Sequence, residues 1–176
     1  MTEPFENAAV AVDTLPDIET VDWQPLASRY LTEVIISRAF FIALIAGGLT
    51  VASLAGKAPA LSIGKAVAAL AALFVLQVAH AVIAVPKKGY ALRQHDMLFK
   101  TGWIFCSVTA VPLNRIQHVE LGRGPLERAL GLAKLQLFTA GGSGSDLALP
   151  GLSVDTGERL REFILGRINT EDDAID

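Results

Sequence analysis

Two long apolar runs, separated by a short connector, constrain this chain more than any other feature. The first run, Ala39 to Gly56, has no charged residue; the second, Ala66 to Val85, has none either, and its only strongly polar members are Gln77 and His80. A bilayer core of roughly 30 Å is crossed by about 20 helical residues. Each run therefore predicts a transmembrane helix.

A buried helical hairpin inside a soluble protein is the alternative interpretation. It requires enough additional sequence to wrap both helices, and 176 residues leave little. The composition also favours the membrane, since 52% of the residues are hydrophobic and the mean hydropathy is +0.45 in spite of two polar tails.

The connector, residues 57–65, is too short to form a domain, so the two helices must run antiparallel and both chain ends must lie on one side. Basic residues gather on that side, whereas the connector holds only Lys57 and Lys65. The positive-inside rule therefore predicts cytoplasmic N- and C-termini. The basic residues expected at the membrane surface, and considered for lipid binding, are Arg29, Arg38, Lys87, Lys88, Arg93 and Lys100.

Both ends of the sequence are acidic. Residues 1–22 contain six acids and no Lys or Arg, which gives no signal-peptide pattern, and residues 170–176 contain four more acids. Although the formal net charge of the chain is −3, the part between the two tails is basic, since it holds all 15 basic residues and 8 of the 18 acids. A basic body beside a membrane can meet anionic headgroups, although topology signalling alone accounts for much of this bias.

Two polar features flank or enter the spans. Trp23, Tyr30 and Arg38 predict an interfacial helix that begins near Pro25, although a longer first membrane helix explains the same residues. Gln77 and His80 share a face of the second helix. An intramembrane polar pair defaults to a functional hypothesis, here a packing or partner contact, or a transport path.

After Pro86 the pattern changes to short strands punctuated by Gly, Pro, Asn and Asp. A helical turn is predicted over Pro125–Leu130, and a final amphipathic helix is capped by Ser153 or Asp155, with an apolar stripe of Leu160, Phe163, Ile164 and Ile168. Such an α+β pattern predicts a small antiparallel barrel or sandwich. The predicted strands are Tyr90–Gln94, Met97–Lys100, Ile104–Val111, Ile116–Leu121, Ala133–Thr139 and Asp146–Leu149.

Four segments of this region carry a family resemblance: GYALRQHDMLFKTG (89–102), VPLNRIQHVE (111–120), GPLERALGLAKLQLFTAGG (124–142) and LPGL (149–152). They resemble the bacterial pleckstrin-homology-like (PH-like) domain of YdbS-type membrane proteins, a domain of unknown function. The resemblance implies a bent antiparallel β-barrel plugged by a C-terminal helix, in the bacterial cytoplasmic membrane. It carries over no catalytic residue. The motif residues are Pro112, Asn114, Arg115, His118, Gly124, Pro125, Glu127 and Arg128.

The expected organisation therefore has five parts. They are an acidic disordered tail (1–22), an interfacial helix (23–38), a transmembrane two-helix hairpin (39–85), a PH-like domain (86–169) and a second acidic tail (170–176).

Enzyme and metal sites find little support in the residues. The Gly141–Ser145 run fails the G-x-S-x-G pattern and lacks the lysine of a phosphate-binding P-loop, so it predicts a hairpin loop. Three scattered histidines and one cysteine do not make a zinc site. We expect no catalytic residue, no cofactor and no nucleic-acid partner.

Three functions remain open. The first, which we favour, is a non-catalytic interaction module at the cytoplasmic membrane surface, whose partners are the bilayer and another membrane protein or a second copy. The second is a sensor of anionic lipid headgroups. The third is a subunit of a transport or export system in which Gln77 and His80 line a path.

Overall fold

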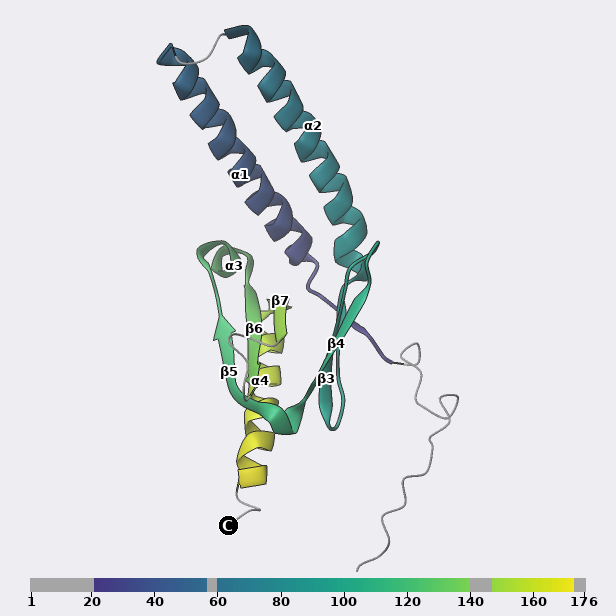
Figure 1. Cartoon of the computed structure of the whole chain (residues 1–176). Coiled ribbons are helices and arrows are strands. Elements are labelled where there is room, and N and C mark those ends of the chain that lie inside the picture. Colours follow the sequence, from purple (N-terminus) through teal and green to yellow (C-terminus); the bar gives the residue numbers. More distant parts are fainter. Residues whose placement is uncertain (1–20, 57–59, 140–146, 173–176) are drawn as a thin grey trace, which may run out of the picture.

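The computed structural model describes residues 21–56, 60–139 and 147–172, without the side chains of 60–62 and 169–172. Residues 1–20 and 173–176 of the acidic tails, and the Gly141–Ser145 loop, lie outside the described residues. Residues 170–172, predicted to begin the second tail, are instead helical. Figure 1 shows a pair of long helices that project from one end of a smaller body of strands and helices.

The two apolar runs form helices α1 (Arg29–Leu54) and α2 (Ala60–Ala84), which pack side by side as an antiparallel hairpin (Figure 1). Both are long and apolar enough to cross a membrane, and their most hydrophobic windows are 0% and 6% buried. Such exposure contradicts the alternative of a hairpin buried in a soluble core. The predicted connector is also shorter than residues 57–65, because Ala60 to Lys65 already belong to α2.

The helical hairpin is inserted between two neighbouring strands. Strand β1 (Gln24–Pro25) precedes α1, strand β2 (Gly89–Leu92) follows α2, and the two strands pair antiparallel with Gln24 opposite Tyr90. The helix predicted to begin near Pro25 begins at Arg29, so that prediction is wrong. Tertiary contacts hold this segment extended, since Leu26 packs against the domain core and the Ala27 N–H donates a 2.9 Å hydrogen bond to the Gly151 carbonyl.

The strands form two antiparallel sheets. The first sheet has the order β1-β2-β3-β4, with β3 at Asp96–Thr101 and β4 at Ser107–Pro112. The second has the order β5-β6-β7, with β5 at Ile116–Gly122, β6 at Leu132–Thr139 and β7 at Leu147–Ser153. The 3-10 helix η4 (Leu113–Arg115) links the two sheets, which are not closed into one hydrogen-bonded barrel.

The core lies between the two sheets and helix α4 (Val154–Asp172). Ser153 caps this helix as predicted, since its Oγ accepts a 3.2 Å hydrogen bond from the Thr156 N–H. Phe163 does not belong to the buried stripe: it is 42% exposed, and the Arg167 guanidinium stacks 5.5 Å from its ring centre. The largest fully buried side chains are Met97, Leu132, Leu135, Leu137, Leu149, Leu152 and Ile164.

The domain also packs against the base of α1. The Arg29 guanidinium donates a 3.3 Å hydrogen bond to the carbonyl of Leu130, at the end of helix α3 (Pro125–Leu130), and Tyr30 is buried against β7. Two apolar helices, antiparallel sheets and a C-terminal helix confirm the predicted α+β class. The helical hairpin therefore joins the domain through paired strands and side-chain contacts rather than through a free linker.

Candidate membrane-surface site

Three lysines lie over three aromatic rings where the helical hairpin meets the domain. The Nζ atoms lie 5.7 Å from the ring centre of Trp103 for Lys87, 5.3 Å from that of Tyr30 for Lys88, and 5.6 Å from that of Trp23 for Lys100. The Lys88 ammonium also donates a 3.2 Å hydrogen bond to the Tyr30 hydroxyl. Each amine lies within the range of a cation–π attraction. We call these six residues the lysine–aromatic cluster.

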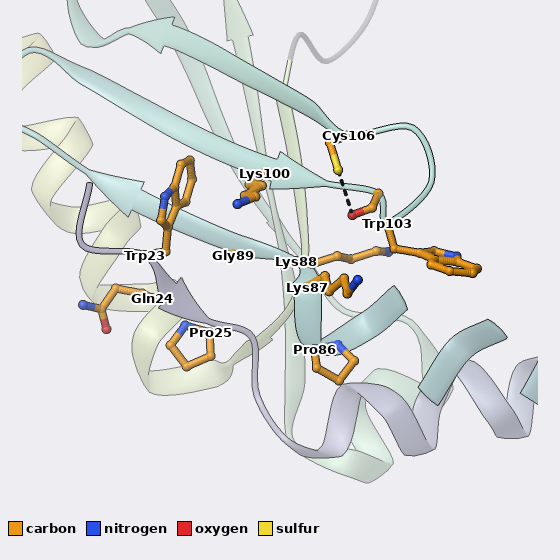
Figure 2. Close-up of a pocket in the computed structure, with 11 residues that line it drawn as sticks. Trp23, Gln24, Pro25, Pro86, Lys87, Lys88, Gly89, Lys100, Trp103 and Cys106 are labelled. Carbon is orange, nitrogen blue, oxygen red and sulfur yellow. Dashed lines mark hydrogen bonds between the residues drawn. The ribbon is translucent and has the colours of Figure 1, made fainter. Parts of the chain in front are cut away.

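Segments far apart in the sequence bring this cluster together. Trp23 precedes β1, Lys87 ends the 3-10 helix η3 (Val85–Lys87), Lys100 lies on β3, and Trp103 follows β3. The pairing of β1 with β2 places Trp23 beside the strand that follows α2. Figure 2 shows the Lys100 amine near Trp23, and Lys87 and Lys88 on the Trp103 side.

A pocket of about 370 Å³ opens between these side chains. Its lining includes all three lysines and both tryptophans of the cluster but no Asp or Glu. Ammonium groups attract anions, and the rings add flat apolar surface beside the charge. The pocket is therefore suited to an anionic group attached to an apolar body.

A short apolar turn adjoins the cluster. Gly102 has φ +93°, and Ile104 and Phe105 follow it with 64% and 90% of their surface exposed. The Trp103 ring makes an edge-to-face contact with His80 of α2 at 6.0 Å between ring centres. The Trp103 indole N–H is covered, yet it has no hydrogen-bond acceptor within the described part of the chain.

The two polar residues of α2 have different partners. The Arg38 guanidinium of α1 donates a hydrogen bond to the backbone carbonyl of Gln77, whereas His80 contacts Trp103. Arg38 and Gln77 therefore link the two helices, and His80 belongs to the domain end of α2. The assigned roles of Gln77 and His80 stay predictions.

Two of the predicted basic residues lie away from the cluster. Arg93 lies in the turn between β2 and β3, at the opposite end of β3 from Lys100, and forms a salt bridge with Asp96 that raises the pKa of its guanidinium. Arg29 is bound to the Leu130 carbonyl. Lys87, Lys88 and Lys100 are thus the predicted cations that the fold brings together.

The motif residues fall into two structural groups. Gly124 and Pro125 begin α3, and the Glu127 carboxylate accepts a hydrogen bond from the Gly124 N–H, which is the half of a capping box that needs no N-cap side chain. Arg128 lies exposed in the last turn. The other group lies near η4. Pro112 ends β4 and Asn114 lines a second pocket of about 300 Å³; Arg115 and His118 are exposed, and the His118 ring lies 5.6 Å from that of Phe138.

Trp103 is the member of the cluster that sequence reasoning missed. The sequence predicts a strand from Ile104, whereas in the structure the strand begins only at Ser107. The sequence does contain a signal for this residue: Trp103, Ile104 and Phe105 form an apolar run directly after the turn glycine Gly102. An exposed apolar run in a turn often marks a binding surface. Among residues 21–56, 60–139 and 147–172, no three His, Cys, Asp or Glu side chains gather in a way that could hold a metal ion.

Comparisons with known proteins identify the family of the chain. The model of the bacterial PH domain family matches residues 31–168. The chain is 31% identical over 85 residues to the transmembrane protein YdbS of Bacillus subtilis, covering 47% of this chain and 52% of YdbS. It is 28% identical over 97 residues to the transmembrane protein YdbT of the same organism, covering 54% of this chain and 20% of YdbT.

The chain thus spans about half of YdbS and a fifth of YdbT. No solved structure matches it significantly. Because the family model covers most of the chain and both relatives are transmembrane proteins, this membrane protein belongs to the bacterial PH domain family, in its YdbS-type group.

Proposed function

We propose that the chain is a membrane-anchored, non-catalytic interaction module whose PH-like domain is presented at the cytoplasmic membrane surface to other membrane proteins or to a second copy. The observation that supports this role best is the insertion of the helical hairpin between β1 and β2. A domain on a free linker can turn in any direction. This domain is joined to the hairpin through β1, before α1, and through β2, after α2. Its orientation relative to the membrane is therefore fixed, and the same surface is always presented to neighbouring membrane proteins.

Sheet edges offer a place for such contacts. Among the described strands, β4 ends the first sheet beside β3, and β5 ends the second sheet beside β6. Ser107, Val108, Ala110 and Pro112 of β4 are exposed. An edge strand presents backbone donors and acceptors that a strand of another chain can pair with.

The charge distribution supports the cytoplasmic orientation. Lys87, Lys88 and Lys100 follow α2, where the domain begins, whereas the sequence between Leu54 and Ala66 holds only two basic residues, Lys57 and Lys65. By the positive-inside rule, this bias supports a cytoplasmic domain. A reporter fused after Asp176 is expected to be active when it requires the cytoplasm and silent when it requires export; the reverse pattern would overturn the orientation.

Site-specific crosslinking in cells tests the interaction role. A photoreactive amino acid at Ala110 of β4, or at His118 of β5, is expected to give a discrete adduct with a membrane protein or with a second copy at native expression. The same amino acid at Glu162, exposed on α4, serves as the comparison. If neither edge position gives an adduct while the chain is present in the membrane, the interaction role is refuted.

Recognition of anionic lipid headgroups is the second candidate, and the lysine–aromatic cluster favours it. Three amines around one pocket that lacks acidic lining residues form a compact positive surface beside the membrane helices. Polybasic surfaces of this kind gain about 1 kcal/mol per Lys or Arg near an anionic leaflet. The two roles are compatible, because one end of the domain faces lipid and the sheet edges face sideways.

A further inference from the structure

We propose that Trp103, Ile104 and Phe105, at the end of the β3–β4 hairpin, insert into the interfacial layer of the bilayer beside α2. This apolar tip is a third membrane contact, in addition to α1 and α2. It lies apart from the sheet edges that are proposed to bind proteins, so the two proposals can fail separately.

The position of the tip gives the first argument. The twenty residues from Ala66 to Val85 match the length of helix that crosses a bilayer core of about 30 Å. His80 and Ala84 belong to the last turns of that span, and together with Trp103, Ile104 and Phe105 they line a pocket of about 320 Å³. Figure 1 shows the end of the β3–β4 hairpin reaching the base of α2. The tip thus lies level with the bilayer boundary.

Exposure gives the second argument. Phe105 and Ile104 are far more exposed than the other large apolar side chains of the described domain, where Phe163 at 42% comes next. In water, both side chains would remain uncovered at a cost of about 25 cal/mol for each Å² of apolar surface. Elsewhere in the described chain, comparable exposure is found on the lipid-facing sides of α1 and α2.

The third argument is the polarity of the residues around the tip. It rises from apolar to amphipathic to basic, as the polarity of a bilayer does from its core to its headgroups. Ile104 and Phe105 are apolar; Trp103 is amphipathic, and tryptophan is enriched at the headgroup level. Lys87 lies on the domain side of the Trp103 ring, where headgroup phosphates are reached.

The tight turn at Gly102 holds the tip in its exposed conformation. A Cβ atom on Gly102 would lie 1.8 Å from the Phe105 carbonyl oxygen, and φ at Gly102 is +93°. Only glycine suits this tight turn, which projects the three side chains from the end of two paired strands. Because the turn is already formed, little conformational entropy is lost on insertion.

Depth-dependent quenching tests the insertion. The chain has a single cysteine, so Cys106→Ser gives a cysteine-free background. In that background, Phe105→Cys is labelled with an environment-sensitive fluorophore, and the full chain is reconstituted into phosphatidylcholine vesicles whose upper acyl chains are brominated. Val82→Cys, exposed near the end of α2, is the membrane reference, and Gln94→Cys, exposed in the turn at the opposite end of β3, is the aqueous reference.

The label at 105 is expected to lose fluorescence as strongly as the label at 82, with a matching blue shift of its emission. A label at 105 that behaves like the label at 94 would overturn the proposal. Because the vesicles contain this chain alone, a tip that leaves water only on binding another protein would give that same contrary result. Phe163→Cys controls for local apolarity, since it lies on an exposed face of α4 and is expected to resemble position 94.

Discussion

Gly151 of β7 lies directly against the ring of Tyr30 at the base of α1, and a Cβ atom on Gly151 would come within 2.3 Å of the Tyr30 Cγ atom. The Gly151 carbonyl also accepts the hydrogen bond from the Ala27 N–H. One glycine therefore joins the second sheet to the segment that leads into the membrane helix. The close approach requires the absence of a side chain, and φ at Gly151 is +68°.

Replacement of this glycine is expected to weaken the junction. In Gly151→Ala, the new methyl group displaces Tyr30 and the backbone is strained, since a left-handed conformation costs a residue other than glycine about 1–3 kcal/mol. The free energy of unfolding in detergent should fall by at least that amount. Gly166→Ala is the control, because a Cβ there meets no atom within 4 Å and alanine stabilises a helix interior by about 0.5–1 kcal/mol. Equal stability of both variants would contradict the packing.

Removal of the cluster's charges is expected to reduce its preference for anionic lipid. In Lys87→Gln, Lys88→Gln, Lys100→Gln, energy transfer from the two tryptophans to dansyl-phosphatidylglycerol should fall towards that to dansyl-phosphatidylcholine. In the wild-type chain, added salt should also lower the energy transfer to dansyl-phosphatidylglycerol, but by less. Arg93→Gln is the matched control, because Arg93 is paired with Asp96 at the other end of β3. A triple variant with wild-type lipid preference would exclude headgroup recognition by these lysines.

The link between the membrane helices is expected to depend on Arg38 and not on the side chain of Gln77. The Arg38 guanidinium binds the backbone carbonyl of Gln77, which every residue at position 77 provides. A hydrogen bond with a charged partner contributes about 1.5–3 kcal/mol. Unfolding in sodium dodecyl sulfate should therefore show Arg38→Met destabilised, with Gln77→Leu close to wild type. If Gln77→Leu is the weaker of the two, the helices are held together by another contact.

The stability of the domain is expected to decline at high pH because of Tyr90. Burial in the core raises the pKa of the Tyr90 phenol above its ordinary value of about 10, so folding favours the neutral form. This contribution is complete below the unfolded pKa and is lost as the pH rises through the folded pKa. Urea unfolding of Tyr90→Phe should show a shallower decline above pH of about 10 than wild type does. If the stability of both proteins declines in parallel, unfolding does not change the pKa of Tyr90.

The features that the sequence predicted well are local ones. The apolar runs, the strand–turn alternation, the start of α3 at Pro125 and the Ser153 cap each depend on neighbouring residues. The β1 strand and the Tyr30–Gly151 contact depend on residues more than 60 positions apart, and tertiary pairing there overrides the helical pattern near Pro25. Phe163 was misplaced because helical spacing alone does not show that the core closes at Ile164.

The candidate site divides in the same way. Lys87 and Lys88 were predicted because positive charge after a span is a local signal. Their grouping with Trp23 and Lys100 follows from the β1–β2 and β2–β3 pairings, which no local pattern reveals. The same pairings separate Arg93 from the cluster, although Arg93 is only five residues from Lys88 in the sequence.

Insertion of the helices between β1 and β2 is expected to fix the domain relative to the membrane. Pulsed electron paramagnetic resonance tests it most directly, with spin labels at Val51 on α1 and Glu158 on α4 in the Cys106→Ser chain in lipid nanodiscs; both side chains are exposed. A domain fixed in this way should give one narrow distribution of distances between the two labels. A broad distribution, typical of a domain that turns freely on a linker, would contradict it.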